Sequence, residues 1–397
     1  MPTSHRLATA CVHAGSHTDV PTEGTAAPVY PATAYGFLDG DHRSYPRYFN
    51  TPNQRRVATK IAALEGAEAG LLFGSGMAAI STTMLALLRP GDHVLLQSGL
   101  YGGTTSHVEH DLRPLGIEVS YTGGRAITDF EAGLRRNTRV VYVETPSNPL
   151  LNVVDLEAVA GLARAHGATS VIDNTFASPI NQQPHRLGID VVVHSATKYL
   201  GGHSDITAGA IATSAETLEP ILAKARHFGG SCEATTAALL ERSMKTLALR
   251  VRQQTDNAQA MAEWLSDRDE VARVYYPGLA SHPDHALARR QMLGFGGMLS
   301  FELAAGIDPV AFQRSLGLVA SAMSLGGVDT TVCSPYLTSH RTISAERRAA
   351  EGISDQLVRM SLGIEDVRDL QEDVAEALAA ARRAAPVGST GPRGVPC

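Results

Sequence analysis

Short apolar segments that alternate with helical segments occupy the middle of the chain, and this alternation constrains the fold more than any other feature. Buried strands are predicted at Val94–Gln97, Glu118–Tyr121, Arg139–Glu144, Thr169–Asp173, Asp190–His194 and Ile206–Thr213. Helical spacing of apolar residues predicts helices at Gly76–Leu88, Thr128–Arg136 and Asp155–His166, the last with Asp155 as its N-cap. Strands of this kind alternating with helices are typical of a mostly parallel sheet covered on both faces. We therefore predict an α/β fold.

The chain has 397 residues, which is too long for one small core, so we expect a large domain and a smaller one. We predict an extended N-terminal arm over residues 1–53, because this stretch is rich in Pro, Gly, Thr and Tyr. The large domain is predicted over 54–255 and a C-terminal α+β domain over 256–385, joined by a long helix from about Ala234. The second domain is predicted to contain a strand at Met298–Leu303 and a last helix at Asp366–Ala384. Residues 386–397 are rich in Pro and Gly and are predicted to be disordered.

Composition narrows the functional classes. The net charge of −6 gives no reason to expect nucleic acid as a partner. Neither a membrane-spanning apolar run of about 20 residues nor the apolar core of a secretory signal is found in the sequence. The four cysteines and fifteen histidines follow no metal-binding spacing. We expect a cytoplasmic enzyme with reduced thiols, no metal, no membrane contact and a small-molecule substrate.

Lysine is rare in this chain, which makes a candidate nucleophile easy to find. The four lysines are Lys60, Lys198, Lys224 and Lys245, and only a lysine amine, not an arginine, can lose its proton and condense with an aldehyde. Lys198 follows the strand Asp190–His194 and opens a loop with two glycines, at the strand end where α/β proteins bind ligands. We interpret the other three lysines as solvated or partly covered surface side chains. Of the four lysines, Lys198 is thus the candidate catalytic residue, and its position alone leaves a catalytic and a non-catalytic role equally open.

The segment around Lys198 carries a family resemblance. The run from Asp190 through Ser195-Ala-Thr-Lys198-Tyr-Leu-Gly-Gly-His-Ser204 resembles the cofactor-lysine signature of the Cys/Met-metabolism enzymes that depend on pyridoxal 5′-phosphate (PLP). This family contains cystathionine γ-synthases, cystathionine γ- and β-lyases, methionine γ-lyases and homoserine-ester sulfhydrylases. The resemblance extends from about Val12 to about Ala384. It implies the fold type I of PLP enzymes with a seven-stranded sheet, a Schiff base between PLP and Lys198, and a homotetramer built from two catalytic dimers.

The resemblance also implies a cofactor-binding set. Ser75, Gly76 and Met77 lie at the start of a predicted helix, and free N–H groups at a helix start bind anions, so they would hold the phosphate. The full set is Tyr45, Arg47, Ser75, Gly76, Met77, Tyr101, Asn148, Asp173, Ser195, Thr197 and Lys198. By this resemblance Asp173 would face the pyridine nitrogen, Tyr101 would stack on the ring and assist proton transfer, and Asn148 would lie near the phenolic oxygen. Tyr45 and Arg47 would reach the phosphate in the neighbouring subunit.

The predicted substrate-binding residues are Arg359, Ser324 and Met323. Arg359 alternates with apolar residues in a predicted strand, and by resemblance it would bind the substrate carboxylate. The sequence departs from the family pattern at Met323, where cystathionine γ-synthases and γ-lyases have Glu, and at Gly103, where methionine γ-lyases have Cys. Further departures lie at Asn50-Thr51-Pro52 in the arm and at Glu233-Ala234.

Three functions are compatible with these residues. The resemblance implies first an eliminating lyase on a sulfur amino acid or homoserine-type substrate such as cystathionine, giving a 2-oxo acid and ammonia. The alternative is a γ-replacing synthase that joins an activated homoserine to a thiol. A non-catalytic binding protein on the same scaffold is the third, and the presence of Tyr101, Asp173, Lys198 and Arg359 together argues against it.

Overall fold

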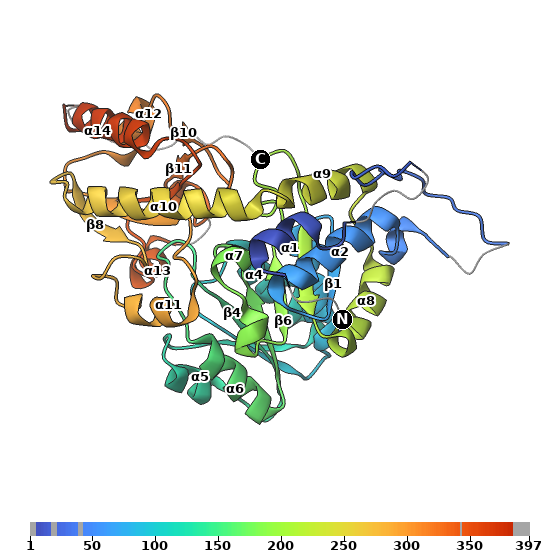
Figure 1. The fold of residues 1–397 in the computed structure, drawn as a ribbon. Helices are drawn as coiled ribbons and strands as arrows, with labels where there is room; N and C mark the ends of the chain where they lie inside the picture. The colour runs from blue at the N-terminus through green and yellow to red at the C-terminus, as the bar shows by residue number, and fades with distance from the viewer. Residues whose placement is uncertain (1–4, 17–21, 39–42, 342–343, 384–397) are drawn as a thin grey trace, which may run out of the picture.

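The computed structural model describes residues 5–16, 22–38, 43–341 and 344–383 (Figure 1). A seven-stranded sheet forms the centre of its larger part, in the order β1-β7-β6-β5-β4-β2-β3. The strands are β1 (Ala69–Phe73), β2 (His93–Leu96), β3 (Glu118–Tyr121), β4 (Thr138–Glu144), β5 (Thr169–Asp173), β6 (Val191–His194) and β7 (Gly209–Thr213). The strands from β3 to β6 pair in parallel, and β7 is antiparallel to both of its neighbours. The predicted mostly parallel, seven-stranded sheet is confirmed.

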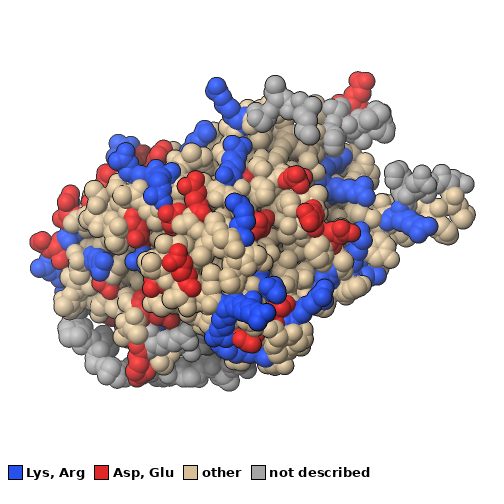
Figure 2. Space-filling view, turned by 90° about the horizontal axis from the view of Figure 1, so that it is seen from below, with Lys and Arg blue, Asp and Glu red and all other residues tan. Residues whose placement is uncertain are grey.

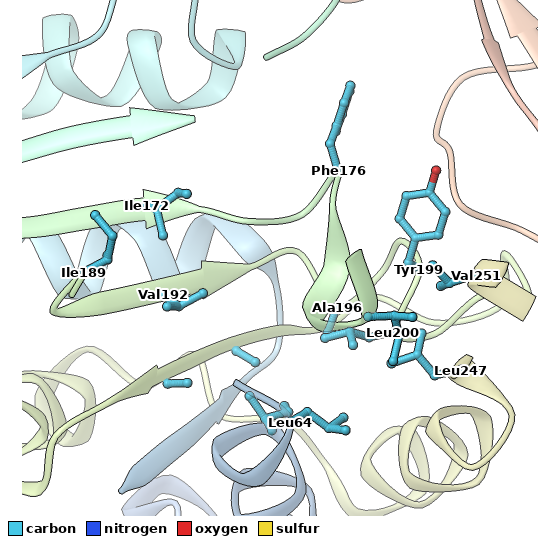
Figure 3. Close-up of a cluster of buried hydrophobic side chains, with 14 of the residues drawn as sticks. Leu64, Ile172, Phe176, Ile189, Val192, Ala196, Tyr199, Leu200, Leu247 and Val251 are labelled. Carbon is cyan, nitrogen blue, oxygen red and sulfur yellow. The ribbon is translucent and has the colours of Figure 1, made fainter. Parts of the chain in front are cut away.

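Each central strand contributes to two apolar cores, because successive side chains of a strand point to opposite faces of the sheet. On β4, Val141 and Val143 belong to one cluster of buried side chains, while Val140 and Tyr142 belong to the other. The first cluster includes Leu64 from helix α2 (Pro52–Glu65). Figure 3 shows this cluster, with Leu64, the sheet residues Ile172 and Val192, and Leu247 labelled. The sheet is thus a buried middle layer, as the continuous apolar character of its strands requires.

Helices cover both faces of this sheet. They include α3 (Gly76–Leu87), α4 (Gly102–His107), α5 (Ile127–Gly133), α6 (Leu156–His166) and α8 (Ala215–Phe228). The predicted cap of α6 is confirmed, since the Asp155 side chain accepts a hydrogen bond from the Ala158 backbone N–H. The helix ends at Gly167, whose φ of 71° is the left-handed conformation that favours glycine.

A smaller five-stranded sheet follows, in the order β10-β11-β12-β9-β8. Its strands are β8 (Val271–Tyr275), β9 (Met298–Leu303), β10 (Ala320–Ser321), β11 (Thr331–Cys333) and β12 (Leu357–Ser361). Helices α12 (Pro309–Ser315) and α14 (Val367–Arg383) contribute to the apolar core beside this sheet. The smaller α+β part is therefore confirmed. The boundary expected at residue 255 stays a prediction, because α10 (Leu247–Ser266) continues across it.

The long connecting helix is interrupted, contrary to the prediction of one helix from about Ala234. It consists of α9 (Ala234–Met244) and α10, and Thr246 between them has a non-helical backbone. The carbonyl oxygen of Ser243 accepts hydrogen bonds from the Thr246 hydroxyl and from Arg250 Nη2. The same oxygen also accepts the Thr246 backbone N–H at 3.2 Å, a three-residue spacing that tightens the last turn of α9, so the side-chain donors lie where the helix breaks.

The N-terminal segment differs from the predicted extended arm at its start, where Leu7–His13 forms helix α1 and packs on α2 and α10. Described residues between α1 and α2 project from the body on the right of Figure 1. Two apolar side chains of this segment are largely uncovered: Phe37 is 72% exposed and Leu38 82% exposed. Figure 2 shows acidic and basic side chains interspersed over the face that lies below in Figure 1.

Three sequence-based expectations remain, on the C-terminal tail, on membrane-spanning helices and on metal ligands. The tail over 386–397, predicted to be disordered, lies outside the described residues. Among the described residues, no helix has both the length and the apolar character needed to cross a membrane. Within the same residues, no cluster of His, Cys, Asp and Glu side chains could hold a metal ion.

Candidate active site

A cavity of about 490 Å³ lies where the loops after β4, β5 and β6 meet the smaller sheet. Its lining contains every residue predicted to contact cofactor or substrate except Tyr45 and Arg47. The predicted residues in the lining are Ser75, Gly76, Met77, Tyr101, Asn148, Asp173, Ser195, Thr197, Lys198, Met323, Ser324 and Arg359. Residues from both sheets thus meet in one cavity.

Lys198 lies in the loop after β6. Its Nζ donates a hydrogen bond of 2.6 Å to the Ser324 hydroxyl, and its carbonyl oxygen accepts from the Gly202 N–H at 2.7 Å. Burial and, to a lesser degree, the Arg359 guanidinium lower the pKa of the Lys198 amine. Both effects favour the neutral amine, which is the form that acts as a nucleophile or base.

Ser324 contacts Lys198 from a loop that is tightly constrained. Ser324 has a φ of 82°, a left-handed conformation that costs a side-chain-bearing residue energy. Two residues later, a Cβ on Gly326 would lie 2.7 Å from the Tyr199 backbone nitrogen, so only glycine fits there. The hydroxyl facing Lys198 is therefore held by backbone geometry rather than by a flexible loop.

The start of α3 forms one wall of the cavity. Ser75 caps this helix by accepting a hydrogen bond from the Ala78 N–H at 3.1 Å. A Cβ on Gly76 would lie 2.8 Å from the Ser195 Cβ, so the absence of a side chain lets the two segments approach closely. The first N–H groups of a helix lack partners within the helix and point outward, so this wall suits a bound anion.

Asp173 ends β5 and is fully withdrawn from solvent apart from the cavity. The Thr175 hydroxyl and the Thr175 N–H both donate to its Oδ1. Burial raises the pKa of Asp173 above the ordinary value, and the Thr175 hydrogen bonds act in the opposite direction. A cation bound against this carboxylate would remove the cost of burying its charge.

Arg359 lies in the middle of β12 with only 6% of its surface exposed. Its Nη1 donates to the Asn148 side-chain oxygen at 2.9 Å, and its Nη2 donates to the Ser324 carbonyl oxygen at 3.1 Å. Both oxygens that accept from the guanidinium are uncharged. Its positive charge is therefore available to an anion in the cavity.

Tyr101 lies at the start of α4, and its side chain is 43% exposed at the cavity. A Cβ on Gly103 would lie 2.4 Å from Cε1 of the Tyr101 ring. Because residue 103 is glycine, the Tyr101 ring can lie against the backbone at this position. A cysteine at 103, as in methionine γ-lyases, would collide with the ring.

Comparison with known proteins agrees with this geometry. A family model described as Cys/Met metabolism PLP-dependent enzyme matches residues 8–379. The chain belongs to this family. It is 40% identical over 376 residues to a cystathionine beta-lyase of Lactococcus lactis, covering 94% of this chain and 98% of that protein. It is 41% identical to an L-methionine gamma-lyase of Pseudomonas putida, covering 91% and 92% of the two chains.

A solved structure from the same family supports the fold. The crystal structure of cystathionine gamma-lyase from Lactobacillus plantarum, complexed with L-serine, superposes with a TM-score of 0.92 at 36% sequence identity. The match covers 95% of this chain and all of that chain. The chain therefore has the fold type I of PLP enzymes, and PLP is the cofactor of the family to which it belongs.

The cavity of this PLP enzyme suits the parts of its cofactor. The start of α3, with the Ser195 side chain against Gly76, offers donors to a phosphate, and the Thr197 hydroxyl, which donates to the Ala208 carbonyl oxygen at 3.1 Å, also lines the cavity. The buried Asp173 carboxylate offers a partner to a protonated pyridine nitrogen, and the Lys198 amine can bond an aldehyde carbon.

Tyr45 precedes the short helix Pro46–Tyr48 and Arg47 lies within it, and both are outside the cavity lining of their own chain. Arg47 donates to the Arg226 carbonyl oxygen, and its guanidinium lies over the Tyr45 and Tyr48 rings. The role predicted for both residues, at the phosphate of a neighbouring subunit, stays a prediction.

The sequence analysis missed several residues of the cavity lining, including Glu144, Thr175, Phe176, Thr207, Thr338 and Ser339. Glu144 had a usable signal: it ends β4 and pairs in register with Asp173 at the end of β5. Burial, followed by the neighbouring Asp173 charge, raises the pKa of Glu144 to about 8.

The interpretation of Lys60 as a surface side chain is wrong. Lys60 is fully buried, and its Nζ donates to the carbonyl oxygens of Cys11 and Val12 and lies 3.4 Å from Glu241. Helix α1 covers it, and the sequence did not predict this helix.

Proposed function

We propose that this protein is a PLP-dependent lyase that catalyses β- or γ-elimination on a sulfur amino acid or homoserine-type substrate. The leaving group departs as a thiol from a sulfur amino acid or as a carboxylate from a homoserine ester. Hydrolysis then yields a 2-oxo acid and ammonia. The observation that carries this proposal is the meeting of the Lys198 amine, the Asp173 carboxylate and the Arg359 guanidinium in one cavity. The named activities of relatives at about 40% identity support it.

In this proposal, one group of residues binds the cofactor. Ser75, Gly76, Met77, Ser195 and Thr197 bind the cofactor phosphate, and Asp173 holds the pyridine nitrogen protonated. Bound in this way, PLP supplies an electron sink for the charge left by a departing proton. The proposed roles rest on the helix start at α3 and on the buried carboxylate at the end of β5.

The substrate is held and deprotonated by side chains of the chain itself. Arg359 binds the α-carboxylate through its guanidinium, which already points into the cavity from β12. The Lys198 amine, whose pKa is lowered, removes the α-proton as a general base. Tyr101 would stack on the cofactor ring and assist proton transfer, and Ser324 and Met323, which share the cavity lining, would contact the substrate.

A γ-replacing synthase is the second candidate. The chain is 41% identical over 337 residues to an O-succinylhomoserine sulfhydrylase of Pseudomonas aeruginosa, covering 85% of this chain and 83% of that protein. The two reactions share their first proton transfers and differ in whether water or a thiol completes the turnover. The proposed set of residues serves either one.

A substrate panel separates the two. We would incubate the holoenzyme with L-cystathionine, L-methionine, O-acetyl-L-homoserine and O-succinyl-L-homoserine, each with and without a thiol, and measure 2-oxo acid and ammonia. The lyase proposal expects 2-oxo acid from at least one substrate without added thiol. A product that forms only with thiol, without 2-oxo acid, would establish the synthase instead.

We also propose that the enzyme is a cytoplasmic homotetramer built from two catalytic dimers, in which Tyr45 and Arg47 complete the neighbour's cavity. The exposed side chains of Phe37 and Leu38 support this, because a large uncovered apolar segment favours a protein partner. Co-expression of Arg47→Ala and Lys198→Ala chains tests it. In a shared site, mixed dimers regain one intact cavity and part of the activity, whereas sites confined to one chain regain none.

A further inference from the structure

Glu144 has no role in the mechanism above, although its side chain lines the cavity and is almost fully buried, with 4% of its surface exposed. One carboxylate oxygen, Oε2, accepts the backbone N–H of Tyr101 at 2.8 Å. The other, Oε1, accepts the backbone N–H of Asn148 at 3.1 Å. Tyr101 follows β2 and Asn148 follows β4, so this side chain links two loops that leave different strands.

The hydrogen bonds continue from Asn148 to the other side of the cavity. Its side-chain oxygen accepts from Arg359 Nη1 at 2.9 Å, and Arg359 Nη2 donates to the Ser324 carbonyl oxygen at 3.1 Å. The Ser324 hydroxyl in turn accepts from Lys198 Nζ at 2.6 Å. A continuous path therefore runs from Tyr101 through Glu144 to Arg359 and Lys198.

We propose that Glu144 is a positioning residue that fixes Arg359 relative to the cofactor-facing Tyr101, so that the substrate carboxylate is bound at the correct distance from the reacting carbon. This inference rests on the proposed role of Arg359 in binding that carboxylate. Glu144 acts only through the two backbone N–H groups and touches neither substrate nor cofactor in this proposal.

Burial raises the pKa of Glu144 to about 8, so binding is compared at a pH above that value, where each oxygen of the ionised carboxylate accepts without donating. The Glu144 backbone is itself fixed, since its N–H donates to the Gln97 side-chain oxygen at 3.2 Å. In Glu144→Gln, the amide NH2 would face one of the two N–H donors, so one loop must move or lose its partner. In Glu144→Asp, both oxygens remain but the shorter side chain cannot reach the same two N–H groups.

The test compares two ligands that differ only in a carboxylate. L-norleucine and n-pentylamine carry the same amine and the same alkyl chain, and only L-norleucine can contact Arg359. Dissociation constants are measured on the holoenzyme from the change in absorption of the bound cofactor. We expect both Glu144 variants to weaken L-norleucine binding about tenfold, the loss typical of a disturbed buried hydrogen bond, and to leave n-pentylamine binding unchanged.

Glu241→Gln is the matched control, since Glu241 is also a buried carboxylate but pairs with Lys60 and Lys245 outside the cavity. It should lower stability in urea and leave both dissociation constants unchanged. Equal weakening of both ligands by the Glu144 variants, or no weakening of either, would overturn the proposal. Normal L-norleucine binding by Glu144→Asp would also overturn it, because charge alone would then suffice.

Two further arms keep the outcome decisive. Should Glu144→Gln not fold, Glu144→Asp decides alone, because it keeps both carboxylate oxygens and must still show the selective loss of L-norleucine. In the double variant of Glu144→Asp with Arg359→Lys, the losses of L-norleucine binding must be less than additive, because both act through the guanidinium. Failure of the proposed lyase function would appear differently, as wild-type protein that binds the cofactor and both ligands but releases no 2-oxo acid.

Discussion

Two lysines of this chain are withdrawn from solvent, and the difference between their surroundings separates a structural amine from a reactive one. Lys60 donates to two backbone carbonyl oxygens and lies 3.4 Å from the Glu241 carboxylate. Lys198 donates to a single hydroxyl, on Ser324, and the charge that acts on it is the positive Arg359. Three acceptors match the three protons of an ammonium, whereas one hydroxyl does not.

The charges near each amine act in opposite directions. Burial lowers the pKa of both, but Glu241 counteracts the effect at Lys60, while Arg359 adds to it at Lys198. Burial alone therefore does not select the nucleophile. What distinguishes Lys198 is that the neighbouring charge adds to the effect of burial on its pKa instead of opposing it.

The largest expected effect follows removal of the Lys198 amine. Lys198→Ala should lose the borohydride-reducible bond to the cofactor and its absorption band near ~420 nm, and activity should fall by at least about 10³-fold. Absorbance spectra before and after borohydride, with peptide mapping, provide the measurement. Lys224→Ala, which changes a lysine outside the cavity lining, is the control and should keep both band and activity. A borohydride-reducible adduct in Lys198→Ala would show that another lysine forms the bond to PLP.

Removal of the Lys60 amine should instead act on stability. Lys60→Met leaves the two backbone carbonyl oxygens without their partner, and breaking a buried ion pair costs about 3 kcal/mol of unfolding free energy. Urea denaturation of the holoenzyme measures this cost. Lys245→Met removes the other, more exposed partner of Glu241 and should cost no more than about 1 kcal/mol. Equal costs for the two would contradict the distinction drawn between them.

The pH dependence of cofactor attachment sharpens the comparison. Because the pKa of Lys198 is lowered from the ordinary lysine value of 10.5, its neutral fraction rises with pH and levels off below 10.5. Below that pKa, the rate at which apoprotein bonds PLP should rise by roughly tenfold per pH unit. Stopped-flow absorbance measures the rate, with n-butylamine in solution as the unperturbed reference amine. A plateau at or above the pH found for n-butylamine would refute the expected direction.

The smallest effect is expected from the hydroxyl that contacts Lys198. Ser324→Ala removes one hydrogen bond and keeps the backbone oxygen that accepts from Arg359, so attachment of PLP should change only about fivefold. Ser339→Ala is a matched control: its hydroxyl also belongs to the cavity lining, but its partner is His340. A change of more than about 100-fold in Ser324→Ala would mean that this hydroxyl itself takes part in proton transfer.

Much of the large sheet was predictable because burial on both faces leaves a plain signal in the sequence. The predicted bounds of β3, β5 and β9 are those of the structure. Strand β1 was missed, since only Leu71, Leu72 and Phe73 are large and apolar and they run directly into the turn before α3. The break between α9 and α10 was not predictable either, because the side-chain contact that Arg250 makes there leaves no signal in the spacing of apolar residues.

The residues of the cavity lining were likewise predictable only in part. Residues named by the family resemblance, such as Lys198 and Asp173, line the cavity where strands end, as expected for an α/β sheet. Glu144 was overlooked although it occupies the equivalent strand end, because the resemblance drew only Asn148 from its segment. The burial of Lys60 depends on α1, a helix packed from 49 residues away in sequence, and local periodicity contains no information about such a contact.

Met323 and Ser324 are adjacent in sequence and differ greatly in their freedom to change. Met323 is 69% exposed at the cavity, whereas Ser324 combines a left-handed backbone with contacts to Lys198 and Arg359. Substitution of the side chain at 323 should therefore cost little folding stability, whereas a change at 324 disturbs the backbone and both contacts. This difference marks 323 as the first position to randomise when the substrate preference of this enzyme is to be altered.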